Sequence, residues 1–240
     1  MRSVIKNIVK KLLEIFDLGI YRISKNSSGA PTHKYHDPFA HIDPLEHNDK
    51  NLIDSKVSIN SIKSEYLTEA RLEFYNKVIS YCLKNRINFD GKDILDAGCN
   101  ANCLLEEISN KFSPSSLTGY DYSEKTIQIA KVISPSSKYE VFDLVEDDAK
   151  IKFDIIFCTQ VIEHIPNANI AILKLLKLAK PGCQILITVP DGRLDQFRGH
   201  IHFWSPESWE IFIRKTIDVK NTKFHFSNGE IGNSVIIKLP

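Results

Sequence analysis

The sequence predicts an α/β protein with a doubly wound, mostly parallel sheet, an N-terminal helical extension and a C-terminal antiparallel hairpin. From residue 65 onward, short apolar strands alternate with amphipathic helices, which is typical of a parallel sheet covered on both faces. Near the end the alternation stops, and two apolar stretches at 223–226 and 234–239 flank a glycine-containing turn, which favours a hairpin. The 240 residues suit one such domain with an extension.

The elements of this domain can be predicted in order from their hydrophobic periodicity. They are a helix ending near residue 84, a strand at 93–96, a helix at 103–112, a strand at 117–121, a helix at 124–133, strands at 139–142 and 153–158, a helix at 169–179, a strand at 184–189 and a helix at 206–215. Sheets of this kind bind ligands beyond the carboxyl ends of their strands, so we expect the functional site in the strand-to-helix loops.

Residues 1–62 are predicted to form an extension before a main domain at 63–240. Residues 1–20 carry apolar side chains at helical spacing with lysines between them, which predicts an amphipathic helix. We expect this helix to pack on its own domain; the alternative is docking to a membrane surface or a partner. Residues 23–62 keep no regular period and are predicted to form a polar loop or lid. Its histidines, whose spacing matches no standard metal site, are His33, His36, His41 and His47.

The charge balance argues against a general nucleic-acid-binding surface. The chain carries 31 Lys and Arg against 30 Asp and Glu, whereas nucleic-acid binders usually show a strong basic bias. The five cysteines lack paired C-x-x-C spacing, which predicts reduced thiols in a cytoplasmic protein. Charged residues interrupt residues 1–20, so we expect neither a signal peptide nor a membrane span there.

The loop after the first predicted strand has the features of a nucleotide-binding turn. The strand contains Asp96 and ends at Gly98, and a strand that ends in glycine and opens a helix lets backbone groups approach a ligand. Asp121 ends the next strand, where a carboxylate can accept hydrogen bonds from both hydroxyls of a ribose. A nucleoside-containing cofactor satisfies this pattern, although each aspartate taken alone could equally be a helix cap or turn residue.

Two segments, ILDAGC at 94–99 and TGYDYS at 118–123, resemble the first two motifs of class I S-adenosylmethionine-dependent methyltransferases. Four later segments follow in the family's order: VFDL at 141–144, FDII at 153–156, VIEHI at 161–165 and KPGC at 180–183. The resemblance covers about residues 93–190. It implies a Rossmann-like methyltransferase fold, methyltransferase activity and S-adenosylmethionine as the cofactor.

The resemblance also implies which residues hold the cofactor. Some of these residues would border the methionine part, the ribose or the adenine of the cofactor, and others would close the pocket. They are Asp96, Gly98, Asn100, Asp121, Tyr122, Asp143, Leu144 and Gln160. Asn100 and Asn102 stand where the family usually has glycine. Asparagine tolerates left-handed backbone, so the turn can survive, but an asparagine side chain can obstruct the cofactor and leave a noncatalytic binding protein.

Histidines after the fourth and fifth predicted strands are candidates for catalysis and acceptor binding. His164 and His200 are predicted to be catalytic, since histidine suits the removal of a proton from a hydroxyl. The alternative is that Glu163 and His164 only begin a helix. His202 and Trp204 are predicted to line the acceptor pocket.

Three further expectations concern the segment that follows. Ser205 is predicted to cap the next helix, Pro206 to open it and Trp209 to lie in the core.

These observations predict methyl transfer to a small-molecule acceptor, a hydroxyl of a sugar or natural product. One alternative is a metal-assisted RNA methyltransferase, because Gln160 to His164 resembles the Glu-x-x-Glu-His metal motif of small-RNA 3′-end methyltransferases. Gln160 replaces the first glutamate of that motif, and the loss of an anionic ligand weakens a hard-cation site, so we predict no metal. The other alternative is a noncatalytic protein of the same fold.

Overall fold

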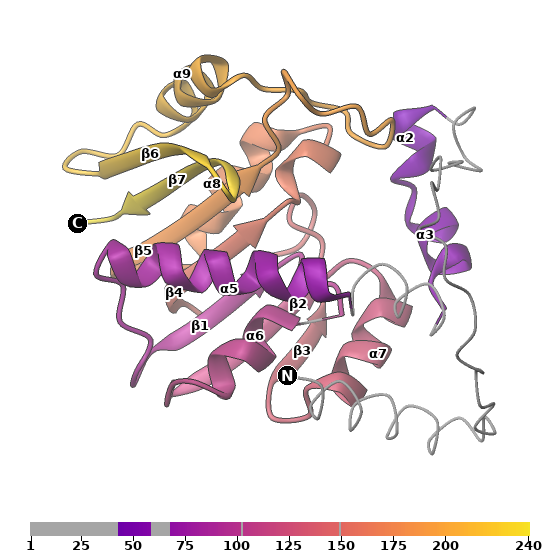
Figure 1. The fold of residues 1–240 in the computed structure, drawn as a ribbon, viewed down its shortest axis with the longest axis horizontal. Coiled ribbons are helices and arrows are strands. Elements are labelled where there is room, and N and C mark those ends of the chain that lie inside the picture. The colour runs from indigo at the N-terminus through magenta and orange to yellow at the C-terminus, as the bar shows by residue number, and fades with distance from the viewer. Residues whose placement is uncertain (1–42, 59–67, 102, 149) are drawn as a thin grey trace, which may run out of the picture.

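A computed structural model describes residues 43–58, 68–101, 103–148 and 150–240 of the chain (Figure 1). The predicted amphipathic helix at 1–20, most of the predicted loop at 23–62 and Asn102 therefore lie outside the described residues. The described part of the predicted main domain begins at Thr68, the residue before the first long helix.

Seven strands form one sheet in the order β3-β2-β1-β4-β5-β7-β6. Their bounds are β1 (Asp93–Ala97), β2 (Ser116–Asp121), β3 (Lys138–Val141), β4 (Phe153–Thr159), β5 (Ala179–Val189), β6 (Lys223–Gly229) and β7 (Gly232–Lys238). The first five strands pair in parallel, while β7 runs antiparallel to both β5 and β6. The predicted mostly parallel sheet with a C-terminal antiparallel hairpin is confirmed.

Helices cover both faces of this sheet, which gives the doubly wound arrangement (Figure 1). One face carries α5 (Glu69–Lys84), α6 (Cys103–Ser109) and α7 (Glu124–Ile133), and the other carries α8 (Ala168–Lys177) and α9 (Pro206–Thr216). Successive residues of β1 point to opposite faces, so Ile94 packs with α5 and α6 while Leu95 packs with α8 and α9. Because both faces are covered, the central strands β1 and β4 are buried at nearly every position.

Serine and threonine side chains begin three of these helices where the sequence has capping residues. Thr68 Oγ1 accepts the Arg71 backbone N–H at the start of α5, and Ser123 Oγ accepts that of Thr126 at the start of α7. Ser205 Oγ accepts the backbone N–H of Ser208 at 3.2 Å, which confirms the predicted cap of α9.

The prediction of a loop without regular structure is wrong for residues 43–58. This stretch forms two short helices, α2 (Pro44–His47) and α3 (Lys50–Lys56). Asp43 and Asp49 accept backbone N–H groups at their first turns. Neither helix buries a residue, so hydrophobic periodicity could not reveal them; the aspartate caps and the proline that opens α2 were the usable evidence.

Trp209 is 1% exposed and lies in the core between α9 and the sheet, as predicted. We expect Trp209→Ala to lower the free energy of unfolding by about 3–5 kcal/mol, because it leaves a large cavity. Trp209→Phe keeps most of the volume and should cost much less. Urea unfolding of the two variants and the wild-type protein measures this difference, and equal stabilities would contradict the assignment of Trp209 to the core.

Candidate active site

The carboxyl ends of β1, β2 and β4 bring the predicted cofactor residues to one edge of the sheet. The loop after β1 begins at Gly98, whose φ of 79° is a left-handed conformation that glycine adopts without strain. A Cβ at Gly98 would lie 2.3 Å from Cγ2 of Val161, so the loops after β1 and β4 are in close contact. The Gly98 and Cys99 backbone N–H groups both donate to Tyr120 O of β2.

Two acidic side chains, Asp96 and Asp121, are buried at this edge and form the first cluster. Asp96 is 3% exposed and Asp121 is 8% exposed. Burial raises the pKa of Asp96 to about 7, with a further contribution from the negative charge of Asp121. Burial also raises the pKa of Asp121 to about 6, although N–H groups of Ser123 and Asn100 oppose this by donating to its carboxylate. Asp96 Oδ1 accepts no hydrogen bond from the described residues.

Asn100 adopts the left-handed conformation that the turn requires, with a φ of 47°. Its backbone N–H donates to Asp121 Oδ2 at 3.0 Å, which ties the loop after β1 to the end of β2. Its side-chain oxygen accepts the Ala101 N–H at 2.6 Å and is thus engaged within the loop. The expectation that asparagine preserves the turn is confirmed for Asn100.

The other predicted cofactor residues lie at the same edge with varied surroundings. Asp143 Oδ1 accepts the backbone N–H groups of Val145 and Glu146, as a turn residue does, while Leu144 is buried in the core. Gln160 follows β4 with a φ of 56°, and its Nε2 donates to Thr188 Oγ1 at 3.2 Å. Their roles toward a cofactor stay predictions.

The segment formed by α2 and α3 lies alongside these loops (Figure 1). The Ser123 hydroxyl donates to Asp54 of α3 at 2.5 Å, and the Tyr122 hydroxyl donates to Asn48 O at 3.4 Å. Asn48 Nδ2 in turn donates to Gly199 O at 2.8 Å. The segment therefore connects the loop after β2 with the loop after β5.

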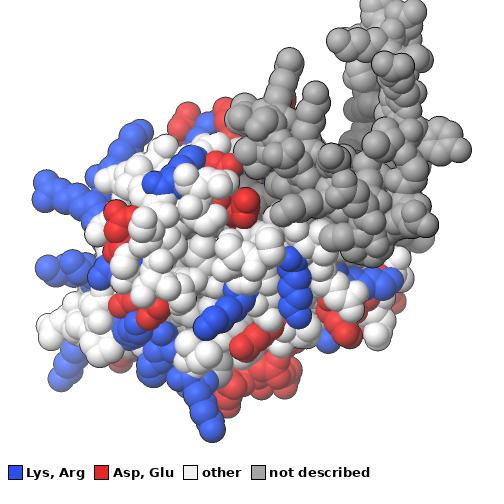
Figure 2. Space-filling model, turned by 90° about the horizontal axis from the view of Figure 1, so that it is seen from below, with Lys and Arg blue, Asp and Glu red and all other residues white. Residues whose placement is uncertain are grey.

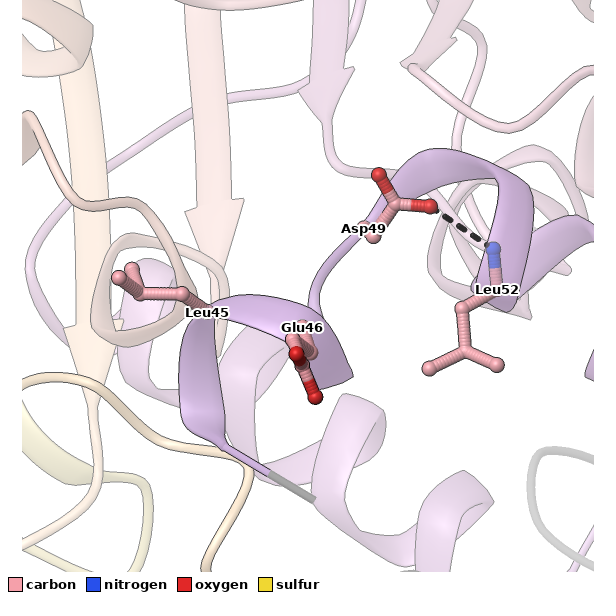
Figure 3. A pocket seen from close by; sticks show the side chains of 4 residues that line it. All are labelled: Leu45, Glu46, Asp49 and Leu52. Atoms are coloured by element: carbon pink, nitrogen blue, oxygen red, sulfur yellow. Dashed lines mark hydrogen bonds between the residues drawn. The ribbon is translucent and has the colours of Figure 1, made fainter.

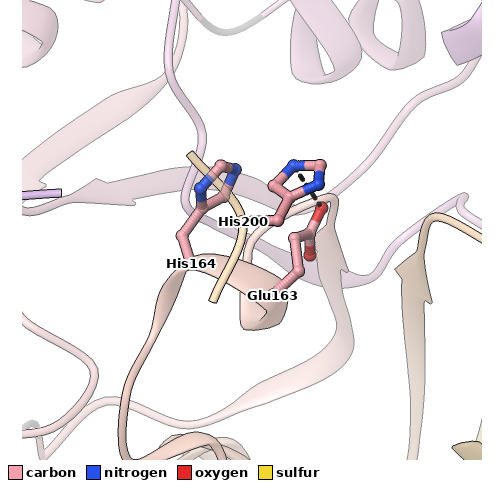
Figure 4. A group of neighbouring side chains, drawn as sticks. All are labelled: Glu163, His164 and His200. Atoms are coloured by element: carbon pink, nitrogen blue, oxygen red, sulfur yellow. Dashed lines mark ion pairs between the residues drawn. The ribbon is translucent and has the colours of Figure 1, made fainter. Parts of the chain in front are cut away.

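A second buried cluster lies after β4, where the short helix η1 (Ile162–His164) presents Glu163 and His164 (Figure 4). His200, from the loop after β5, joins them, and one ligand-type atom from each residue lies within 4.8 Å of the others. Glu163 is fully buried, and neither of its carboxylate oxygens accepts a hydrogen bond from the described residues. We predicted no metal from the sequence, but the structure brings together a set of side chains that can bind one.

The environment fixes how each histidine of this cluster is held. His164 Nδ1 lies 3.2 Å from Gly199 O and donates to it. The Nδ1 atom of His200 hydrogen-bonds to the Asp195 carboxylate, while its Nε2 lies 3.9 Å from Glu163 Oε1. Burial lowers the pKa of His164 to about 4, and burial raises that of Glu163 to about 8. The sequence indicated both histidines, but not that Glu163 joins them or that Asp195 holds His200.

The structure gives His202 and Trp204 partners outside this cluster. His202 Nε2 donates to Ile165 O at 3.0 Å, and its ring stacks on that of Trp204 with centroids 4.7 Å apart. Trp204 also stacks on Phe212 of α9 and packs against the core. Their predicted role in acceptor binding stays a prediction, and the contacts observed here are structural.

A surface hollow of about 580 Å³ lies on α2 and α3, lined by Leu45, Glu46, Asp49 and Leu52 (Figure 3). None of the residues predicted to bind the cofactor or the acceptor lines it. We place the candidate active site instead at the two buried clusters, because they hold titratable groups whose pKa values are shifted by burial.

The charged surface agrees with the balanced composition. Among the described side chains visible in Figure 2, basic and acidic groups are interspersed. In the part of the chain that the structure describes, no helix has the length and apolar character needed to cross a membrane.

Comparison with protein families identifies the class to which this site belongs. A methyltransferase domain model matches residues 66–218, more than half of the chain. The chain belongs to this methyltransferase family. The predicted class, a class I S-adenosylmethionine-dependent methyltransferase with S-adenosylmethionine as its cofactor, is thereby confirmed.

Individual relatives are more distant. The ubiquinone biosynthesis O-methyltransferase of Dechloromonas aromatica is 26% identical over 166 residues, which cover 67% of this chain and 59% of the relative. That of Coxiella burnetii is 28% identical over 123 residues, covering 49% of this chain and 51% of the relative. The chain spans about half the length of the curated relatives it matches.

Solved structures confirm the fold. Magnesium protoporphyrin IX methyltransferase from Synechocystis has a TM-score of 0.55 at 15% identity and covers 90% of this chain and 100% of its own. The plantazolicin methyltransferase BpumL has a TM-score of 0.62 at 16% identity, and the match covers 82% of this chain and 94% of BpumL. An amino pentose methyltransferase from Micromonospora echinaspora has a TM-score of 0.57 at 11% identity, with 77% and 99% covered.

The residues at the first cluster fit S-adenosylmethionine. Asp96 Oδ1 is a buried oxygen without a hydrogen-bond partner among the described residues, and it can accept a bond or face a positive charge. Asp121 is the residue that would hold the ribose, and Gly98, in a left-handed conformation, turns the loop beside it.

Replacement of Asp121 tests the ribose assignment. We expect Asp121→Ala to weaken S-adenosylmethionine binding by about 1.5–3 kcal/mol, the value of a charge-assisted hydrogen bond. The matched control is Asp218→Ala, which removes an exposed carboxylate. Calorimetric titration measures both, and unchanged affinity in Asp121→Ala would defeat the assignment.

The raised pKa of Asp121 also predicts a pH dependence of cofactor binding. Ribose hydroxyls donate to the ionised carboxylate, whereas the ligand-free protein holds a proton on Asp121 below about pH 6. Affinity for S-adenosylhomocysteine should therefore rise with pH, by about tenfold between pH 5 and pH 8, and binding should release protons. In the ligand-free protein, the free energy of unfolding changes with pH in the opposite direction to the affinity. A raised carboxyl pKa stabilises the fold at low pH, and this stabilisation is lost as the pH increases through 6. An affinity that does not change with pH in the wild-type protein would contradict this account. So would the same pH dependence of affinity in Asp121→Asn as in the wild-type protein.

Proposed function

We propose that this protein transfers the methyl group of S-adenosylmethionine to a hydroxyl oxygen of a small molecule, a sugar or a natural product. Two relatives named as O-methyltransferases support oxygen as the acceptor atom. Structural neighbours named for magnesium protoporphyrin IX, plantazolicin and an amino pentose support a small acceptor. The positive and negative charges of the chain are nearly balanced, so there is no general attraction for a polyanionic acceptor.

The contact between Gly98 and Val161 carries this proposal. Val161 immediately precedes η1, so the contact sets Glu163 and His164 beside the cofactor loop. Burial raises the pKa of the Cys158 thiol, and the charges of Glu163 and Asp96 raise it further, which indicates that the two clusters are neighbours. An acceptor hydroxyl held by the second cluster would thus lie near a methyl donor held by the first.

In this proposal, the chain supplies position and activation for the reaction. S-adenosylmethionine supplies an electrophilic methyl group on a sulfonium. Holding the acceptor oxygen in line with that methyl can account for much of the rate. His164 and His200 are the residues that act on the hydroxyl, and Asp195 orients His200 through its Nδ1.

The α2–α3 segment forms one wall of the proposed site. It hydrogen-bonds to the loop after β2 at Ser123 and to the loop after β5 at Gly199. We assign it to an extension at 1–62 that precedes the main domain at 63–240. As a wall of the site, the α2–α3 segment limits the access of water, which favours methyl transfer to the acceptor over transfer to water.

An RNA acceptor has less support. Gln160 Nε2 donates to Thr188, so this side chain is held by β5 rather than by the second cluster. Among the described side chains on the face in Figure 2, acidic groups lie between the basic ones, which disfavours a phosphate backbone there. A methyl-transfer assay with labelled S-adenosylmethionine separates the two acceptor classes. Label should appear in hydroxyl compounds from a panel of phenols, sugars and natural products, and label in short RNA alone would refute the proposal.

The catalytic assignment predicts the effect of removing His200. With an acceptor found in that panel, His200→Ala should lower kcat by about 10²–10⁴-fold, the usual contribution of a group that assists proton transfer. Affinity for S-adenosylhomocysteine should stay within about twofold of wild type. The control is His225→Ala, on the exposed side of β6. Wild-type kcat in His200→Ala would remove the histidine from the mechanism.

A further inference from the structure

We infer that Glu163, His164 and His200 form a binding site for one divalent transition-metal ion of the zinc type, next to the proposed acceptor site. The candidate ligand atoms are a carboxylate oxygen of Glu163 and one ring nitrogen of each histidine (Figure 4). Two imidazoles and one carboxylate are a ligand set that suits Zn²⁺ and related ions and leaves coordination positions open. The role of this ion in catalysis rests on the proposed function, whereas its binding does not.

The distances in the cluster are close to those that an ion imposes. Two ligands of one ion, each about 2.1 Å from it, lie about 3.0–3.4 Å apart. His200 Nε2 and Glu163 Oε1 are 3.9 Å apart, and all three ligand atoms lie within 4.8 Å of one another. Side-chain rotations can close this difference.

Both histidines are held in the manner of metal ligands. In such sites the ring nitrogen that does not bind the ion usually donates to a backbone carbonyl or a carboxylate, which fixes the tautomer and directs the other nitrogen to the ion. His164 Nδ1 donates to Gly199 O, and His200 Nδ1 donates to Asp195. In each ring, therefore, Nε2 carries the lone pair that can bind an ion.

The charges around Glu163 are also those of a cation site. A fully buried carboxylate without hydrogen bonds is unfavourable unless a positive charge faces it. Arg71 of α5 contributes a positive charge, but Asp195 adds a second negative one. Two negative charges against one positive leave a net negative charge around Glu163, which a cation would offset.

Such an ion would activate the acceptor. With the ion bound, His164 and His200 would act on the hydroxyl as ligands of the ion and not as bases. A hydroxyl bound to the ion has a lowered pKa, so its O–H bond breaks at neutral pH and the proton leaves to solvent. The electron pair on oxygen then forms the new bond to the methyl carbon, while the pair of the C–S bond stays on sulfur and converts the sulfonium to a thioether. No oxidant or other co-reactant is needed.

The direct test measures metal binding by the full chain without a polyhistidine tag, after chelator treatment and dialysis. Titration with Co²⁺, followed by its visible absorption, and with Zn²⁺, followed by calorimetry, should show one ion per chain. Glu163→Gln should weaken binding at least about 100-fold, and Asp195→Asn, which changes only a positioning residue, about 10–100-fold. His225→Ala should bind as wild type does. If Glu163→Gln does not fold, as judged by circular dichroism, His200→Ala and Asp195→Asn decide the question.

The outcomes separate this inference from the proposed function. Absence of stoichiometric Co²⁺ and Zn²⁺ binding, or wild-type affinity in folded Glu163→Gln and Asp195→Asn, would overturn the metal site. Full methyl transfer by metal-free protein would overturn the role of the ion and leave the proposed function intact. Stoichiometric metal binding by a chain that binds no S-adenosylhomocysteine would support the site and refute the proposed function.

Discussion

Two carboxylates buried at one edge of a parallel sheet are the constraint on which the rest of the structure depends. Asp96 and Asp121 come together because β1 and β2 run in parallel and end side by side. Burial disfavours their charged forms, and N–H groups from Ser123 and Asn100 offset this for Asp121. Asp96 Oδ1 has no comparable partner among the described residues. A ligand that carries hydroxyls and positive charge relieves both carboxylates, which is why the edge suits S-adenosylmethionine.

The same physical logic applies to the second cluster. Glu163 is buried without a hydrogen-bond partner in the described structure, and His200 and Asp195 surround it from the loop after β5. The tight contact of Val161 with Gly98 couples this cluster to the cofactor loop. A change in the position of η1 would therefore alter both clusters, so activation of the acceptor and placement of the cofactor depend on the same turn.

Much of the domain could be predicted from the sequence because its elements follow local rules. Alternating apolar strands and helices indicated the sheet, and Ser205 marked the start of α9 through its capping side chain. The short helices α2 and α3 were not predicted, because they bury no residue and have no apolar periodicity. For the second cluster the sequence indicated His164 and His200 but not that Glu163 joins them, because Glu163 and His200 are 37 positions apart and only the tertiary fold places the loops after β4 and β5 together. Within the loop after β5, nothing local indicated that His200 turns to Glu163 while His202 stacks on Trp204.

The most direct measurement is a crystal structure of the full chain with S-adenosylhomocysteine bound. The account predicts the ribose hydroxyls on the Asp121 carboxylate, with the ligand's amino-acid part beside Asp96 and Gly98. A ligand bound elsewhere, or an Asn100 side chain that fills this space and leaves Asp121 without contact to the ribose, would contradict it.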